Sequence, residues 1–427
     1  MRTHVRVVWQ GQVGDHSPMP IAAPFQEGGN SGTLIGMKDS LLPAVETAWI
    51  SERARALGFD GCGVAPAEKF PELGHFSDWL DRGYAGAMKY LEDPRRLDPR
   101  SPMPGVRSLI VCALNYNSGL PYSTEIEHFK NRTEAPRGWI SRYAWGDDYH
   151  EVLWEKLNAL AAEMRVHFPE PFEVRAYADT GPVHERAAAK YAGLGWLAKN
   201  TLLINQSLGS WLFLGVVLTS LPLAPTLGPT DVPSPDRCGT CRRCLDACPT
   251  EAIVEPYVLD ASRCISYLTI ELRGAIPEQF REPMGRHVFG CDICQDVCPW
   301  NGRSPRTELG EFQPRALAAN DDEANEETLF LPDLLRIASL TQEQFREFFR
   351  GSPIKRTKWQ GLVRNACIAL GNQSDEPGSN RYREITKTLE NVAGCADAVM
   401  GESARWALSR IQAKGKAKIP GSYPARS

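Results

Sequence analysis

The sequence has no apolar run of the roughly 18 residues that a membrane-spanning helix requires. The longest apolar stretch, Trp211 to Leu223, is interrupted by Thr219, Ser220 and Pro222. The N-terminus also lacks the basic and apolar regions of a secretory signal peptide. We therefore expect a soluble protein of the cytoplasm that makes no contact with membranes.

Neither sign of charge is in excess, because 48 basic residues stand against 52 acidic ones and the formal net charge is -4. That balance excludes a uniformly basic coat protein for nucleic acid, although it leaves room for local basic patches. Of the 427 residues, 42% are hydrophobic and 23% are charged, which excludes a largely disordered chain. At about 100 to 200 residues per domain, the length predicts two to four domains.

Cysteine is concentrated in one segment, since eight of the twelve cysteines fall between Cys238 and Cys298. Without a signal peptide, such clustering indicates metal or redox chemistry in a reducing compartment rather than disulfide bonds. The other four stand singly in apolar or helical surroundings, and we interpret them as buried core thiols: Cys62, Cys112, Cys367 and Cys395.

Alternating helical and strand-like patterns precede the cysteine segment. Apolar residues recur at helical spacing in three predicted helices, Leu41–Leu57, Tyr149–Val166 and Val183–Ala192. Strand-like runs occur at Ser108–Asn115, Glu173–Ala178 and Trp211–Thr219. The alternation predicts an α/β (α+β) core, and a Pro-rich bridge from Leu221 to Asp236 separates it from the cysteines.

Helical patterns separated by short loops dominate the chain from Pro332 onward, which is typical of HEAT-like helix pairs. The polar stretch Asn320 to Thr328 reads as a solvated linker before them. We thus expect four parts: a disordered extension at 1–36, ending before Met37; the core at 37–225; a ferredoxin-like 4Fe-4S domain at 226–310; and an acidic linker with a HEAT-like domain at 311–427.

The cysteine spacing is that of bacterial ferredoxins, in which three thiolates of a run hold one iron-sulfur cube and the fourth ligates the other. The first run, made of Cys238, Cys241, Cys244 and Cys248, has this spacing in full. The second run, made of Cys291, Cys294 and Cys298, repeats the end of the first, and its leading cysteine is displaced upstream to Cys264. Crosswise ligation predicts two sets: Cys238, Cys241, Cys244 and Cys298 for one cluster, and Cys248, Cys264, Cys291 and Cys294 for the other. Two zinc sites are the alternative, but zinc gives no reason for this spacing.

Five segments resemble epoxyqueuosine reductases: Trp139 to His150, Tyr177 to Pro182, Gly195 to Thr201, Cys264 to Gly274, and Gly290 to Pro299. The resemblance implies reduction of epoxyqueuosine to queuosine in the wobble position of tRNA, the last step of queuosine formation. It also implies cobalamin, two 4Fe-4S clusters and an external low-potential electron donor. Because the sequence has no Asp-x-His-x-x-Gly element, we expect no histidine ligand to cobalt; we also expect a monomer.

The resemblance assigns Asp179 as the proton donor, and we expect burial beside a corrin to raise its pKa. An Asx-turn or a helix cap before Val183 is the alternative role of this residue. The candidates for cofactor contacts are Arg96, Ser141, Arg142, Tyr149, Asp179, Asn200, Thr201 and Ser210. Capping and core hydrogen bonds are the alternative for each of them.

A cluster of basic residues around Trp359 is the candidate RNA-binding surface: Lys355, Arg356, Lys358 and Arg364. A solvated helix face would show the same pattern. Two other classes remain open for the whole chain. Reductive dehalogenases combine related cobalamin and cluster domains, but they carry an export signal and no HEAT-like tail. A non-enzymatic ferredoxin module with an accessory domain would bind no corrinoid.

Overall fold

The computed structural model describes residues 42–125, 135–228, 230–317 and 327–418. The predicted extension at 1–36 and most of the acidic linker lie outside these ranges. Within them, no helix is both long enough and apolar enough to cross a membrane.

The core is built from helices and strands in mixed order. Its helices are α1 (Leu42–Ala56), α2 (Phe76–Asp81), α3 (Tyr149–His167) and α4 (Glu185–Tyr191). Its strands are β1 (Gly61–Pro66), β2 (Ser108–Asn115), β3 (Trp139–Ile140), β4 (Val174–Tyr177), β5 (Trp196–Leu197), β6 (Leu203–Ile204) and β7 (Leu212–Thr219). The predicted helices and strands of this part are therefore present, with ends that differ by a few residues.

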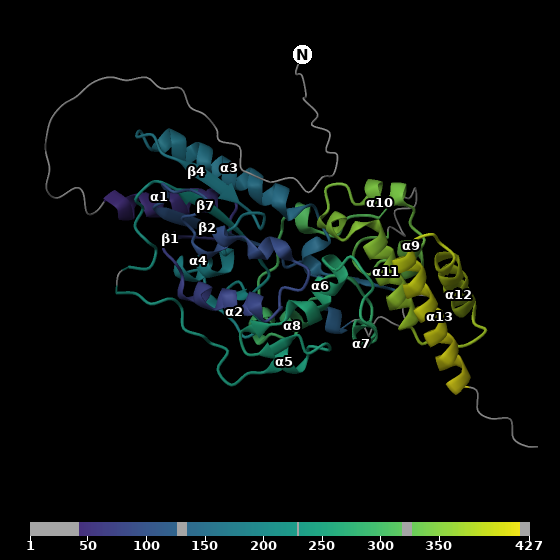
Figure 1. The fold of residues 1–427 in the computed structure, drawn as a ribbon. Coiled ribbons are helices and arrows are strands. Elements are labelled where there is room, and N and C mark those ends of the chain that lie inside the picture. Colours follow the sequence, from purple (N-terminus) through teal and green to yellow (C-terminus); the bar gives the residue numbers. More distant parts are fainter. Residues whose placement is uncertain (1–41, 126–134, 229, 318–326, 419–427) are drawn as a thin grey trace, which may run out of the picture.

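A four-stranded sheet in the order β1-β2-β7-β4 forms the centre of the core, and each neighbouring pair is antiparallel. The core is thus of the α+β rather than the parallel α/β kind. Alternate residues of β2 enter different cores: Leu109 and Val111 pack toward α4, whereas Ile110 and Cys112 pack toward α1 and α3. Both faces are covered, so every residue of β2 is buried (Figure 1).

The cysteine segment consists of short elements: α5 (Arg243–Asp246), β8 (Ile253–Glu255), β9 (Val258–Leu259), α6 (Ile265–Ile270), α7 (Glu278–Arg281), β10 (His287–Phe289) and α8 (Ile293–Asp296). Helices α5 and α8, one from each cysteine run, pack against each other. Strand β10 pairs in parallel with β3 of the core. This pairing joins the cysteine segment to the chain immediately before α3.

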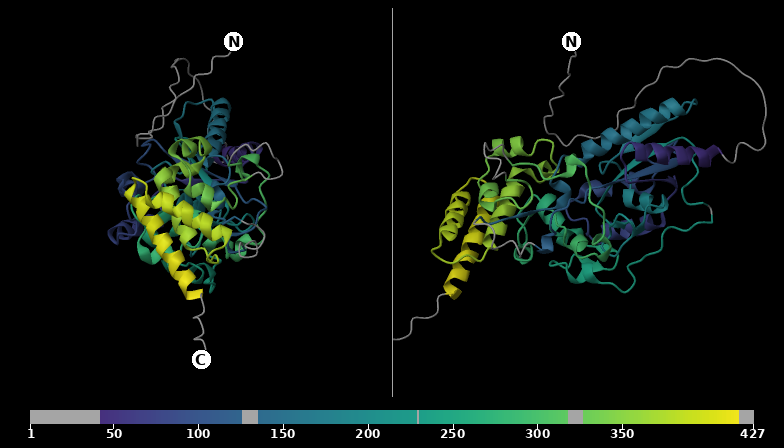
Figure 2. Two further views of the ribbon diagram at one scale, coloured as in Figure 1. Left: turned by 90° about the vertical axis from the view of Figure 1, so that its right-hand side faces the viewer. Right: turned by 180° about the vertical axis from the view of Figure 1, so that it is seen from behind.

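The C-terminal part is helical, with α9 (Leu334–Ala338), α10 (Gln342–Phe348), α11 (Lys358–Gly371), α12 (Asn380–Ala393) and α13 (Ala398–Lys418). Helix α13 packs against both α11 and α12. These helices lie at the end of the molecule opposite the sheet (Figures 1 and 2). They share one apolar core with Trp139 of β3 and Phe289 of β10, so the helical part is anchored on the junction of the other two.

Arg364 of α11 is fully buried in this anchor, which contradicts its predicted role in RNA binding. Its guanidinium donates hydrogen bonds of 2.6 to 2.7 Å to the carbonyl of Leu268 in α6 and to those of Leu272 and Gly274, which follow this helix. Burial lowers the pKa of Arg364 to about 10, so the group stays charged at neutral pH. The side chain reads as an exposed basic residue in the sequence because its partners lie about 90 residues away.

Arg364→Met is expected to destabilise the helical part because it leaves three buried carbonyls without donors. At roughly 1 kcal/mol or more for each, the loss should reach about 3 kcal/mol. Urea denaturation followed by circular dichroism measures it. Lys358→Met on the exposed start of the same helix is the matched control and should stay within about 0.5 kcal/mol of the parent. An equal midpoint for the two variants would contradict the anchoring role.

Candidate functional site

Asp179 lies in the loop between β4 and α4, and its backbone is left-handed, with φ at +59°. Asp and Asn are among the few non-glycine residues that adopt this conformation readily. The residue that begins α4 as its cap is His184, and Asp179 does not cap the helix. The cap role that its sequence position suggested is therefore excluded, and 64% of the side chain stays exposed.

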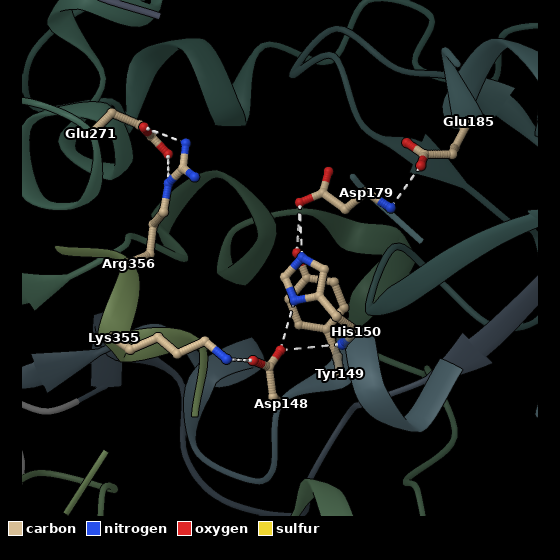
Figure 3. Close-up of polar contacts among 8 residues, drawn as sticks. All are labelled: Asp148, Tyr149, His150, Asp179, Glu185, Glu271, Lys355 and Arg356. Carbon is tan, nitrogen blue, oxygen red and sulfur yellow. Dashed lines mark hydrogen bonds and ion pairs between the residues drawn. The ribbon is translucent and has the colours of Figure 1, made fainter. Parts of the chain in front are cut away.

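The side chains nearest to the Asp179 carboxylate come from the start of α3 (Figure 3). Tyr149 donates a hydrogen bond of 2.7 Å to Oδ2, and Nε2 of His150 lies 3.6 Å from the same oxygen. The other ring nitrogen of His150, Nδ1, lies 2.6 Å from Oδ1 of Asp148. Asp148 also caps α3, because its carboxylate accepts the backbone N–H of His150. One imidazole thus stands between two carboxylates.

These contacts set the pKa of Asp179 in the opposite direction to the one we expected. Desolvation by surrounding atoms raises its pKa, but the contact with His150, the charge of that imidazolium and the hydrogen bond from Tyr149 outweigh it. The pKa falls to about 2, so the isolated site holds a carboxylate. The expectation for this pKa left out the contact with His150, which stands 29 residues away in sequence.

Two neighbours of Asp179 hold protons at neutral pH. Burial lowers the pKa of His150, but its contacts with Asp148 and Asp179 raise it to about 9. Burial, together with the charge of Asp179, raises the pKa of Glu185 to about 8. Glu185 is the first residue of α4, and its carboxyl accepts the backbone N–H of Asp179 at 2.8 Å. Asp179 therefore has a protonated group at its carboxylate, His150, and another at its backbone N–H, Glu185.

The helical part contributes charges to the same site from the turn before α11. Nζ of Lys355 lies 2.7 Å from Oδ2 of Asp148, and Arg356 makes a two-pronged contact of 3.0 Å with Glu271 (Figure 3). About half of each basic side chain is exposed. Of the four residues predicted to bind RNA, these two and Lys358 lie at the surface, whereas Arg364 does not.

Tyr90 is a surface residue that the sequence analysis did not single out. The residue is 47% exposed, and two guanidinium groups lie near its ring, that of Arg96 at 5.8 Å and that of Arg356 at 5.5 Å from the ring centre. Arg96, a predicted cofactor contact, also donates to the Tyr90 carbonyl. The usable signal in the sequence was the tyrosine five and six residues before Arg95 and Arg96, because bases stack on exposed aromatic rings beside basic residues.

Two of the predicted cofactor contacts, Ser141 and Arg142, are instead buried around Asp292 of the cysteine segment. The Asp292 carboxylate accepts the Ser141 hydroxyl and the backbone N–H of Arg142. The Arg142 guanidinium donates to Ser118 and to the carbonyls of Leu120 and Pro121. Through Asp292, both residues join the core to the cysteine segment. Their contact with a cofactor stays a prediction.

Asn200 and Ser210 have a similar place. Asn200 donates to the carbonyl of Cys294, and Ser210 bonds Asn301 and Gln295 around the end of the second cysteine run. Thr201 differs, because it is partly exposed, has φ at +65°, and accepts a hydrogen bond from Arg186 through its carbonyl. Besides Tyr149 and Asp179 themselves, Thr201 and Arg96 are therefore the predicted contacts that are partly exposed rather than bonded to the cysteine segment.

Thiols from the two cysteine runs raise one another's pKa, and the contributing pairs include members of the same crosswise set. Burial raises the pKa of Cys244 to about 11, and Cys298 and Cys238 add to the rise. Burial likewise raises the pKa of Cys294, with contributions from Cys264, Cys248 and Cys244. The thiols are thus near neighbours across the two runs, and the link from Cys294 to Cys244 places the two sets side by side.

The surroundings of these thiols contain the donors that iron-sulfur sulfurs accept. The backbone N–H of Ala252 points to Sγ of Cys248 at 3.3 Å. The indole N–H of Trp196 is buried without a partner among the described residues, and it lies close enough to Cys238 to lower that thiol's pKa. Among the described residues, no group of three or more His, Cys, Asp or Glu side chains is placed so that it could hold a single metal ion.

The chain is similar in sequence to known protein families. A family model described as epoxyqueuosine reductase QueG, DUF1730, matches residues 96–180, and a 4Fe-4S double cluster binding domain matches residues 237–301. The epoxyqueuosine reductase of Xanthomonas campestris pv. campestris is 37% identical over 370 residues, which cover 86% of this chain and 97% of the relative. That of Gloeobacter violaceus is 43% identical over 339 residues, covering 78% and 98%.

The chain belongs to the epoxyqueuosine reductase family. It is accordingly an oxidoreductase. A crystal structure of epoxyqueuosine reductase with a tRNA-Tyr epoxyqueuosine-modified stem loop has a TM-score of 0.72 at 29% identity, covering 86% of this chain and 90% of that one. The epoxyqueuosine reductase of Streptococcus thermophilus has a TM-score of 0.71 at 30% identity, covering 89% and 95%.

Cys248→Ala and Cys264→Ala are expected to damage the same cluster, although Cys248 belongs to the first run. Each variant should lower the iron content from about eight to about four atoms per chain, because a cube that lacks one thiolate is lost. Iron analysis and electron paramagnetic resonance after anaerobic reconstitution measure this. Cys395→Ala, outside both sets, is the control and should keep full iron. Two variants that lost different clusters would refute the crosswise ligation.

Proposed function

We propose that this chain reduces epoxyqueuosine to queuosine in the wobble position of tRNA, the last step of queuosine formation. Electrons pass from an external low-potential donor through two 4Fe-4S clusters to cobalamin beside Asp179. The observation that carries the chemical part is the Asp179 carboxylate beside protonated His150, with protonated Glu185 bound to the backbone N–H of the same aspartate. The related crystal structure of epoxyqueuosine reductase with a modified tRNA stem-loop supports tRNA as the substrate.

Cobalamin fits the open side of the Asp179 loop on two observations. Nε2 of His184 is buried and has no hydrogen-bond partner among the described residues, and burial lowers its pKa to about 4, so the ring is neutral. Exposed Thr180 and Arg186 flank it in sequence. A polar group lying here would satisfy the histidine, and Arg96 and Thr201 would contact the cofactor. When bound, cobalamin would supply electrons at the epoxide carbon.

The protein would supply the protons. Removal of the epoxide oxygen as water consumes two electrons and two protons, and two protonated side chains flank Asp179. His150 would release its proton toward the developing alkoxide through the Asp179 carboxylate. Glu185 would supply the second of the two protons. Tyr149 would hold the carboxylate in place through its 2.7 Å hydrogen bond.

Electrons would enter at the cluster set that contains Cys298. A hollow of about 690 Å³ opens beside Cys298, and its lining includes Arg243, Asp246 and Tyr122. None of its lining residues belongs to the Asp179 group, so a donor bound there would leave the substrate side free.

The experiment that tests the function is anaerobic reconstitution with iron, sulfide and cobalamin, followed by nucleoside analysis of tRNA that carries epoxyqueuosine. We expect cluster and corrinoid absorbance together with conversion to queuosine. A chain that bound clusters but no corrinoid, and converted no tRNA, would favour the ferredoxin-module alternative. Turnover of a halogenated aromatic compound without turnover of tRNA would favour the dehalogenase alternative.

Asp179→Asn is expected to lower turnover about a hundredfold, the scale of general-acid catalysis. Asn tolerates the left-handed backbone and still accepts the Tyr149 hydrogen bond, but it cannot carry the proton. Single-turnover conversion of a modified stem-loop measures the rate, and cluster and cobalamin spectra establish loading. Near-normal turnover would remove Asp179 from catalysis. Loss of cobalamin together with turnover would make it a cofactor anchor.

The pH dependence of turnover follows from the two raised pKa values. His150 and Glu185 are protonated below about pH 8 and lose their protons as the pH rises through about 8 to 9. Turnover should therefore be nearly constant from about pH 6 to 7.5 and fall above pH 8. Single-turnover rates at saturating stem-loop measure this, with cluster absorbance as the integrity control at each pH. A rate that rose through this range would contradict the proposed proton sources.

A further inference from the structure

Lys355 differs from the other exposed basic residues of its turn because its partner is a buried carboxylate. Only 2% of the Asp148 side chain is exposed, whereas 56% of Lys355 is. Asp148 directs Oδ1 to the His150 ring and Oδ2 to Lys355. Lys355 therefore completes a row of alternating charges that runs from the helical part through Asp148 and His150 to Asp179 (Figure 3).

We propose that Lys355 is a positioning residue of the reductase site, which acts through Asp148 on the acidity and orientation of His150, rather than a contact for RNA phosphate. The proposal rests on the proposed function, since it assumes that His150 supplies a proton during reduction. It replaces the role that the basic cluster suggested from sequence alone. The helical part then contributes to the chemistry as well as to binding.

The direction of the effect follows from the order of the charges. The negative charge of Asp148 favours the protonated form of His150, and the positive charge of Lys355 offsets part of it. Neutralising Lys355 leaves the full charge of Asp148 on the imidazole, which then holds its proton more strongly. A weaker acid transfers that proton more slowly at neutral pH, and it keeps the proton to a higher pH.

Charged groups face His150 from three elements of the structure. Asp148 lies on its own helix start, Asp179 approaches from the loop before α4, and Glu185 and Arg186 stand behind Asp179 at the start of α4. Lys355 is the group contributed by the turn before α11. The Tyr149 ring stacks on the imidazole at 4.0 Å and carries no charge at neutral pH, because burial raises its pKa.

The test compares Lys355→Met and Lys355→Gln with Lys355→Arg in the reconstituted full chain, using single-turnover reduction of a modified stem-loop from about pH 6 to 10. Both neutral variants should lower the saturating rate about tenfold at pH 7. They should also move the second step of the alkaline fall, which His150 sets near pH 9, upward by about one pH unit, while the step that Glu185 sets near pH 8 stays in place. Lys355→Arg should restore both, because it returns the positive charge. The stem-loop concentration at half-saturation should change less than about twofold in all three.

Lys358→Met is the matched control from the same surface, since the Lys358 side chain is exposed and Lys355, not Lys358, is the lysine that pairs with Asp148. As a proposed phosphate contact, it should raise the half-saturating concentration and lower the salt dependence of binding, while the alkaline fall stays in place. Lys355 variants that behaved like Lys358→Met, with an unmoved alkaline fall, would overturn the proposal. Full activity of Asp179→Asn would instead refute the proposed proton path, whatever the Lys355 variants show.

Discussion

The pairing of the Asp179 carboxylate with the His150 imidazole is the contact on which the arrangement of the site depends. It requires the loop after β4 to place a left-handed aspartate opposite the start of α3, and it requires α3 to begin at a capping carboxylate that holds the other side of the ring. The sheet satisfies the first requirement by pairing β4 with β7. The apolar row Leu153, Leu157 and Leu160 satisfies the second, because it fixes α3 against the sheet.

The same contact explains why three parts of the chain converge here. The core contributes Asp179 and His150, the turn before α11 contributes Lys355, and the cysteine segment positions that turn through Glu271 and the buried anchor of Arg364. A second buried carboxylate, Asp292, ties the cysteine segment to the residues just before α3. Proton-carrying groups and cluster thiols are therefore held at fixed separations by buried hydrogen bonds, rather than by flexible linkers.

Much of the fold could be predicted from the sequence, because apolar periodicity is a local property: β2 begins and ends where the pattern placed it, and α3 differs by one residue. The clustered cysteines could be named because ferredoxin spacing is a short local motif, and Asp179 could be named because the segment around it resembles that of a known family. The Asp148 row could not, since its members are separated by up to about 200 residues and its chemistry lies in their distances. Arg364 shows the same limit, because basic composition alone does not distinguish a phosphate contact from a buried clamp.

The low pKa of Asp179 in the free protein and its proposed part in proton transfer are compatible once substrate binding is considered. Solvent reaches 64% of the side chain in the free protein, and this water stabilises the charged carboxylate and imidazolium together. A nucleotide and a corrin that cover the loop would remove that water, and desolvation disfavours both charges of the pair. Movement of one proton from His150 to Asp179 converts the pair into two neutral groups, so the cost of desolvation drives the transfer. The expected rise in the pKa of Asp179 would thus occur on binding, when the epoxide is beside the carboxyl that must protonate it.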